Sequence, residues 1–360
     1  MKMKTAIFYI SIFILLGMAI TSCAPAEDNN EYETEEQNPE DANNIYWYYS
    51  YEAEDLLTPD KFGMTAGEFS PYTVAHWGDT LFVANSGTAG YSVFLFSMKS
   101  GRTIKNLKTW IFKGEEKSFN SGSSIDAIVP TGNRLYVVER QSLIHVFSMP
   151  SLEYISCIGD GVWSHQVFQA QAMIVKDGLI FARDKDSNIS IYKETDVTQE
   201  NYQNVNRWKQ AKGTGSANNS FMPHSMVINE EGNIMLTDYE SRCIRTLNTS
   251  LVTENMENGN NIDIDSERIT TDFKPKTFAI NKDKIYVTGD NNIINVYDRK
   301  TKQWGNGFNS INGYTFGQPI RIYAQNDSVF WISDIATDRQ TVVKMVAYKN
   351  KVYEYNKYSK

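Results

Sequence analysis

The chain reads Phe221-Met222-Pro223-His224, continues through the apolar residues Met226-Val227-Ile228, and after a polar turn reads Gly232-Asn233-Ile234-Met235-Leu236-Thr237-Asp238. Short apolar runs bounded by Pro, Gly, Asn and Asp are typical of β-strands joined by tight turns. This stretch therefore predicts two antiparallel strands, and a further strand follows where the apolar pair Ile244 and Leu247 occurs.

The same pattern recurs along the chain. Each copy can be marked by the apolar residue just after its polar turn, which gives Leu81, Leu135, Leu179, Ile234, Ile285 and Val329. A repeat of about fifty residues suits a four-stranded blade, and a single antiparallel blade cannot cover both of its faces. The sequence therefore predicts an all-β fold, a six-bladed β-propeller of four-stranded antiparallel blades.

Three copies begin with Phe-x-Pro, at Phe69-Ser70-Pro71, Phe221-Met222-Pro223 and Phe273-Lys274-Pro275, while the second copy lacks this start. Together with residues 232–238 these starts resemble the NHL repeat and its TolB-like relatives, over about residues 62–350. The resemblance implies a six-bladed propeller but says little about function, because such propellers serve as interaction platforms, sugar-binding modules, lyases and lactonases. Strand spacing alone also leaves open a β-sandwich or two small barrels.

The first 22 residues have the layout of a secretory signal peptide, with Lys2 and Lys4 ahead of an apolar run over residues 6–20. The segment Ile20-Thr21-Ser22-Cys23 resembles the bacterial lipobox, which implies cleavage before Cys23 and lipidation of its sulfur. An ordinary signal peptide with an incidental cysteine is the alternative. We expect residues 1–22 to be removed and Cys23 to carry a permanent membrane anchor, since several acyl chains bind a membrane far more strongly than one.

Residues 23–44 are expected to form an acidic, disordered tether, because they contain few large apolar residues. Residues 24–60 hold twelve acidic residues and no Lys or Arg, so the remainder from Lys61 onward has a net charge close to +2. A nearly neutral domain has no electrostatic footprint for nucleic acid, and we expect no such partner. Glu27 and Asp28 resemble an export signal of some Gram-negative lipoproteins, which implies an outer-membrane lipoprotein at the cell surface.

Residues 45–360 are expected to form the propeller together with an N-terminal aromatic arm. Large apolar groups are seldom left in water, so we interpret the arm as a strand or segment packed on the propeller rather than an exposed ligand platform. The arm contains Tyr46, Trp47, Tyr48, Tyr49 and Tyr51. Cys157 and Cys243 each lie alone on an apolar strand pattern and are interpreted as buried and unpaired.

The repeat also predicts which end of the channel carries function. The turns between first and second strands are short, as in Trp77-Gly78-Asp79, whereas extra residues collect in the stretches 113–124, 195–220 and 254–272. We expect these longer stretches to gather on the opposite face, beside the channel. They and their neighbours would bring to that face Trp163, His165, Trp208 and Lys212.

A ring of polar side chains is expected at this channel mouth. The residues at the start of the six innermost strands are Tyr72, Asp126, Gln171, His224, Lys276 and Arg321. Such a ring can bind a sugar, a carboxylate or a peptide, although polar residues also line channels that hold only water. These six residues are the predicted ligand-binding site.

Metal chemistry is the other possibility. Pro223-His224 followed by Thr237-Asp238 resembles the metal-binding blades of propeller amidating lyases, which need several histidines, and only His165 and His224 are expected near the channel. Six-bladed lactonases hold calcium with carboxylate and amide oxygens, and acids that could serve in this way follow the second strands. They are Glu139, Asp184, Asp238, Asp290 and Asp334. Aspartate there also caps the following turn, so we expect no metal or other cofactor.

The leading hypothesis is a non-enzymatic, membrane-anchored lipoprotein whose propeller face binds a carbohydrate, a peptide or a partner protein. No nucleophile elbow, phosphate loop or dinucleotide fingerprint occurs in the sequence. The alternative is a metal-assisted lyase or lactonase with its site in the channel. That alternative requires three or more ligand side chains to converge at the channel mouth.

Overall fold

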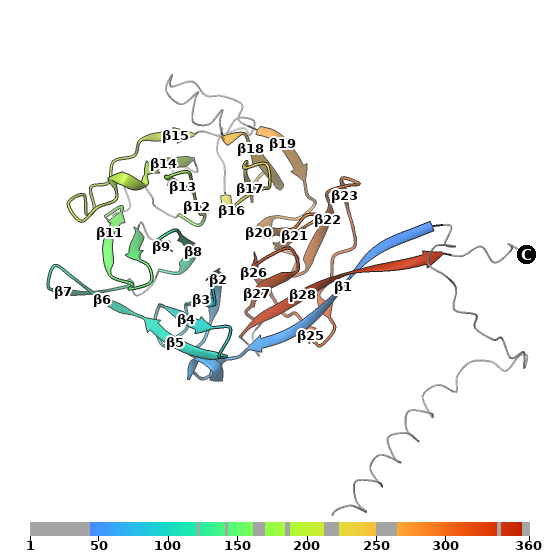
Figure 1. Ribbon diagram of the computed structural model, residues 1–360, viewed down its shortest axis with the longest axis horizontal. Helices are drawn as coiled ribbons and strands as arrows, with labels where there is room; N and C mark the ends of the chain where they lie inside the picture. The colour runs from blue at the N-terminus through green and yellow to red at the C-terminus, as the bar shows by residue number, and fades with distance from the viewer. Residues whose placement is uncertain are drawn as a thin grey trace, which may run out of the picture. The chain divides into compact units, whose positions relative to one another are not determined.

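The computed structural model describes residues 44–120, 123–140, 143–160, 170–183, 188–211, 223–249, 265–336 and 340–354. The chain forms two compact units, of which the larger, Tyr48–Asn350, holds the propeller. The described strands form six four-stranded antiparallel blades, with their first strands around the centre (Figure 1). The predicted all-β six-bladed propeller is confirmed, and all six marker residues lie in second strands.

The first three blades are built from consecutive strands. Blade 1 contains β2 (Pro71–Trp77), β3 (Thr80–Asn85), β4 (Ser92–Ser97) and β5 (Arg102–Leu107). Blade 2 contains β8 (Ile125–Thr131), β9 (Arg134–Glu139), β10 (Leu143–Ser148) and β11 (Tyr154–Ile158). Blade 3 contains β12 (Met173–Lys176), β13 (Leu179–Arg183), β14 (Ile189–Lys193) and β15 (Lys209–Ala211).

Two further blades follow in the same way, and the last one differs. Blade 4 contains β16 (Pro223–Ile228), β17 (Ile234–Asp238), β18 (Cys243–Leu247) and β19 (Asp265–Thr270). Blade 5 contains β20 (Pro275–Ile280), β21 (Lys284–Gly289), β22 (Ile294–Asp298) and β23 (Gln303–Trp304). Blade 6 contains β26 (Pro319–Ala324), β27 (Val329–Asp334), β28 (Thr341–Glu354) and, as its outermost strand, β1 (Asn44–Leu57).

Short elements occupy some of the connections. The hairpin β6 (Thr109–Phe112) and β7 (Glu115–Ser118) lies between blades 1 and 2, and β24 (Ser310–Ile311) pairs with β25 (Tyr314–Thr315) between blades 5 and 6. Single 3-10 turns occur at η2 (Pro59–Phe62) and η3 (Glu194–Asp196). Within the described ranges, no helix has the length and apolar character needed to span a bilayer.

The first described strand closes the ring, because β1 pairs with β28 at the outer edge of blade 6. Part of the aromatic arm is packed in this position. The Tyr51 ring lies 4.7 Å from that of Phe308, and the Tyr49 hydroxyl donates a 2.5 Å hydrogen bond to Asp283. The ring of Tyr48, in contrast, is 51% exposed. The arm is therefore a strand of the propeller in which Tyr49 and Tyr51 are half-buried, whereas Tyr46, Trp47 and Tyr48 are exposed.

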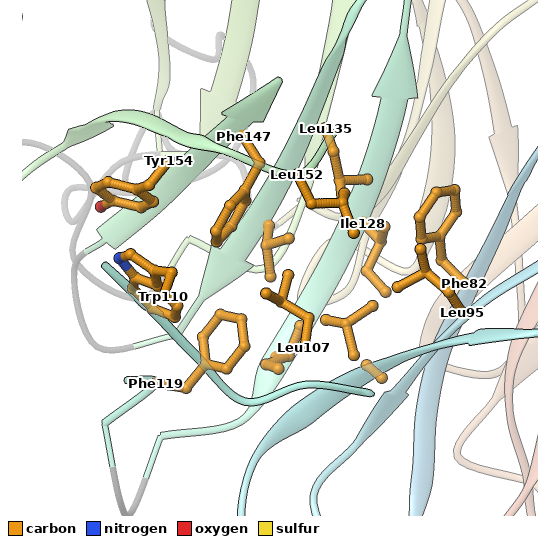
Figure 2. Packing of buried hydrophobic residues seen from close by; sticks show 14 of the residues in the cluster. Phe82, Leu95, Leu107, Trp110, Phe119, Ile128, Leu135, Phe147, Leu152 and Tyr154 are labelled. Atoms are coloured by element: carbon orange, nitrogen blue, oxygen red, sulfur yellow. The ribbon is translucent and has the colours of Figure 1, made fainter. Parts of the chain in front are cut away.

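The core is divided among the gaps between blades. In the described residues each gap between neighbouring blades holds one cluster of buried apolar side chains. Figure 2 shows the cluster between blades 1 and 2, where Trp110 of β6 lies among aromatic rings of blade 2. Its indole ring is stacked 5.0 Å from Tyr154 and meets Phe147 edge-on at 5.2 Å. Since apolar burial is the main stabilising term in folding, each blade depends on both of its neighbours.

The Phe-x-Pro starts have a structural explanation. Pro71 is the first residue of an innermost strand, a position where a proline removes no bond that the sheet needs. The preceding residue, Ser70, donates its backbone N–H to Oδ1 of Asn85 at 2.7 Å. The same bond recurs in blades 5 and 6, between Lys274 and Asp290 and between Gln318 and Asp334. A side chain at the end of each of these second strands therefore holds the start of the innermost strand.

The structure corrects the predicted position of the long connections. The stretch 195–220 contains the outermost strand β15, and 254–272 contains β19, so neither is a single crossover between blades. Residues 195–208 precede β15 and residues 254–264 precede β19, and each third-to-fourth connection begins beside a short first-to-second turn. The Glu194 N–H donates to the Gly178 carbonyl at 2.9 Å, and the Thr249 hydroxyl donates to the Gly232 carbonyl at 3.3 Å.

Trp208 is consequently in a different place from the one predicted. Its backbone N–H donates to the Ile191 carbonyl at 2.8 Å, so it lies beside the outer strands of blade 3 rather than beside the channel. Both outermost strands were overlooked because their polar sequences lack the alternation of a half-buried strand. Trp163, His165 and Lys212 lie outside the described residues.

The two cysteines of the propeller are free and buried, in agreement with their interpretation. Cys157 belongs to β11 of blade 2 and Cys243 to β18 of blade 4. Burial raises the pKa of the Cys157 thiol to about 11, so this group stays protonated and unreactive at neutral pH.

Candidate functional site

A cavity of about 450 Å³ runs along the axis of the propeller. All six innermost strands contribute to its wall, among them residues of the predicted ring. Asp126, Gln171, His224 and Arg321 line the cavity directly. Tyr72 and Lys276 belong to the same ring by their positions in β2 and β20, but they are not part of the cavity wall.

Blades 1 and 2 supply a hydrogen-bonded group around Asp126. This carboxylate is almost completely buried, and Arg140 binds both of its oxygens, at 2.7 Å through Nε and 3.2 Å through a terminal nitrogen. The same terminal nitrogen donates to the Tyr72 hydroxyl at 2.9 Å. Ser124 adds a further bond to Asp126 at 2.7 Å. Both oxygens of this buried carboxylate therefore have hydrogen-bond donors from the protein.

Blades 4 and 6 meet across the channel mouth through Arg321. This side chain is 7% exposed, and its guanidinium donates a 2.7 Å hydrogen bond to the His224 carbonyl. It also lies over the Tyr72 ring, 5.0 Å from the ring centre, in a cation–π contact. The His224 imidazole is stacked on Tyr239, with the ring centres 4.6 Å apart. Tyr72, His224 and Arg321 are therefore brought together at the channel mouth.

The remaining ring positions are Gln171 and Lys276. Gln171 accepts a 3.0 Å hydrogen bond from Arg183, which is almost completely buried at the end of β13. Lys276 is half-buried, and its carbonyl accepts a 3.0 Å bond from the Thr237 hydroxyl. Amide and guanidinium groups fixed in this way are suited to recognising a polar ligand.

The charges around His224 are mainly positive. Burial, together with the positive charges of nearby side chains, lowers the pKa of its imidazole to about 3. Those side chains are Arg321, Arg183, Arg140 and Lys276. His224 is therefore neutral at physiological pH, and the site carries its positive charge on arginine and lysine instead.

The acids considered for calcium are used by the fold. Glu139 contacts His145 at 2.7 Å, and Asp238 contacts Arg245 at 2.7 Å, both inside blades. Asp290 and Asp334 accept the backbone bonds described above. Asp184 and His165 lie outside the described residues. No group of three or more potential ligands among His, Cys, Asp and Glu occurs in the described ranges.

Arg140 and Arg183 were not predicted as parts of the site. Both occur at the end of a second strand, next to the acids that we considered for calcium. The sequence signal was the presence of arginine beside the polar acceptor in two successive blades, Glu139-Arg140 and Arg183-Asp184. Only the fold shows that their side chains bind ring residues.

The fold and the site together define a class: a six-bladed β-propeller with a polar, cation-rich channel mouth. Solved structures support the fold. A structural genomics protein of unknown function from Bacteroides thetaiotaomicron is 12% identical, with a TM-score of 0.52, over 85% of this chain and 77% of that chain. The Cps50 (Swd1) β-propeller domain of Myceliophteria thermophila is 9% identical, with a TM-score of 0.51, over 81% of this chain and 99% of that one.

A third structure, U3-55K, is 11% identical, with a TM-score of 0.52, over 79% of this chain and 78% of that chain. At such identities the similarity shows the fold alone. No family model matches this chain, and no curated protein matches it.

Proposed function

We propose that this protein is a binding protein that captures a carbohydrate, a peptide or a partner protein at the channel mouth. The observation that supports the proposal most strongly is the convergence of fixed polar side chains on one cavity from different blades. Arg321 and Asp126 are almost completely buried there, and each is held by a partner from the protein. Such pre-positioned groups lower the entropic cost of capturing a ligand.

The test compares the two ends of the channel. A variant with Gln171, His224, Lys276 and Arg321 all changed to Ala should no longer bind ligands detected on carbohydrate and peptide arrays. A matched variant with Asp79, Asn133 and Asp327 changed to Ala should bind as the unchanged protein does, since these residues belong to the opposite turns. Loss of binding in the turn variant alone would contradict the proposal. Melting temperatures of both variants check that the propeller is folded.

We further propose that the propeller is a lipoprotein of the cell envelope, anchored through Cys23 and carried on the acidic tether 23–44, at the outer membrane and exposed at the surface. The lipobox-like segment before Cys23 supports this proposal. Cys23→Ala should move the protein from the membrane fraction to the soluble fraction. Membrane association that survives the change would place the anchor elsewhere, and protease treatment of intact cells tests surface exposure.

The relationship to NHL-type and TolB-like repeats is also a proposal. It is supported by the prolines that begin β2, β16 and β20 after Phe-x, and by the recurring bond from the preceding residue in blades 1 and 5. A sequence profile built from relatives of this chain should match NHL repeats in these positions.

A further inference from the structure

Arg321 has more hydrogen-bonding capacity than the protein uses. Its guanidinium carries several N–H groups, and its hydrogen bond to the His224 carbonyl is the one bond it makes within the described part of the chain. Arg321 is only 7% exposed, yet it lines the axial cavity. The N–H groups that this bond leaves unused are accessible from the cavity, where the acceptors of a ligand can reach them.

The surrounding charges favour an anion as that ligand. Asp126 is the one acidic residue among the described residues of the cavity wall, and Arg140 already binds both of its oxygens. Lys276 adds positive charge near His224. In a partly enclosed cavity this excess of positive charge attracts a carboxylate more strongly than it would in open water.

The shape and the wall of the cavity restrict the ligand further. The six innermost strands surround the cavity, so a ligand enters end-on with a terminal group. One side of the wall is His224, whose ring is backed by the stacked ring of Tyr239. Flat aromatic surfaces beside fixed polar donors suit the apolar face and the hydroxyl groups of a sugar ring.

We propose that the channel mouth binds a terminal acidic sugar, with the carboxylate of the sugar on Arg321 and its ring against His224. This inference rests on the proposed binding function and names the class of its ligand. A guanidinium fork matches the geometry of a carboxylate and can form two parallel hydrogen bonds with it.

Isothermal titration calorimetry with digalacturonate, its methyl ester and tri-alanine tests the inference on the unchanged protein. We expect digalacturonate to bind, and the ester to bind at least about tenfold more weakly because it lacks the negative charge. Equal affinity for acid and ester overturns the anionic ligand. If tri-alanine binds and digalacturonate does not, the ligand is not an acidic sugar, but the proposed binding function stands.

Variants then locate the carboxylate. Arg321→Gln should weaken digalacturonate binding about 10- to 100-fold, and Arg321→Lys, which keeps the charge but not the fork, should lie in between. Arg299→Gln is the matched control. Arg299 pairs with Glu230 near the opposite turns, so this change should leave the affinity for digalacturonate unchanged. If Arg321→Gln does not fold, Arg321→Lys and the ester comparison decide. Unchanged affinity in both Arg321 variants overturns the site.

Discussion

Two sets of polar side chains lie at the same end of the blades. One set binds the backbone of the protein, and the other lines the axial cavity. Residues at or just after the ends of the second strands, such as Asp334 and Asp290, accept hydrogen bonds from the backbone that enters the innermost strand of the same blade. The residues that start the innermost strands, such as His224 and Arg321, face the axial cavity. In the sequence both sets are isolated polar residues beside apolar runs. The two sets differ in how much of their hydrogen-bonding capacity the protein itself uses. A side chain whose capacity is fully used is structural, and one with capacity left over is a candidate for binding.

Removing the most heavily used acceptor should have the largest effect. Asp334 is fully buried and accepts bonds from the Tyr314 hydroxyl at 2.9 Å and from the N–H groups of Gly317 and Gln318 at 2.9 and 2.5 Å. Asp334→Ala leaves these donors without a partner and should lower the free energy of unfolding by about 4 kcal/mol. Denaturant unfolding measures the change.

Asp334→Asn is the control, since its amide oxygen keeps part of the bonding and should cost about half as much. A loss below about 1 kcal/mol in Asp334→Ala would remove the distinction between the two sets.

The second prediction concerns His224 and pH. The pKa of its imidazole is about 3 in the folded protein, against 6.5 for an ordinary histidine, because of burial and the nearby charges of Arg321, Arg183, Arg140 and Lys276. Below pH 6.5 the unfolded chain therefore binds a proton that the folded chain does not. The contribution of the neutral His224 imidazole to the free energy of unfolding is complete above pH 6.5. This contribution is lost as the pH falls toward about 3.

Because His224 is half-buried, the loss at about pH 4.5 should be about 2 kcal/mol. His224→Gln cannot take up the proton, so the variant should gain that amount relative to the unchanged protein between pH 7 and pH 4.5. Unfolding curves at several pH values measure the difference. Parallel pH profiles would show that His224 is not held neutral.

The smallest effect is expected for a lightly used acceptor. Asp290 is exposed and accepts a single 2.9 Å bond from the Lys274 N–H. Asp290→Ala should lower the free energy of unfolding by about 1 kcal/mol and leave ligand binding at the channel mouth unchanged. A loss as large as that of Asp334→Ala would mean that burial does not set the cost.

The fold was predictable because the second strands repeat one pattern. Residues such as Leu135 and Ile285 follow a polar turn and begin strands that are buried on both faces, which makes them legible as apolar runs. The outermost strands were not predictable, since β15 and β19 are edge strands with polar sequences. The pairing of β1 with β28 was equally hidden, because local pattern carries no information about partners so far apart in the chain.

The positions of the ring residues in the candidate site were predictable from the sequence. The arginines that bind those residues were not. The position of Arg321 at the start of an innermost strand followed from the repeat. The roles of Arg140 and Arg183 did not, because their side chains reach Asp126 and Gln171 across strands. A contact between side chains of different strands depends on register and on side-chain direction, which a single sequence does not specify.

The closure of blade 6 has a kinetic consequence. The outermost strand, β1, comes first in the described chain, and its partner β28 comes last. Blades 1 to 5 contain only neighbouring segments and can each form locally, whereas the ring closes only when β1 and β28 meet. Pairing of segments so distant in sequence carries a large loop-closure entropy and is slow. Folding should therefore show a late step in which the two ends join, and a circular permutation that made β1 follow β28 directly would remove it.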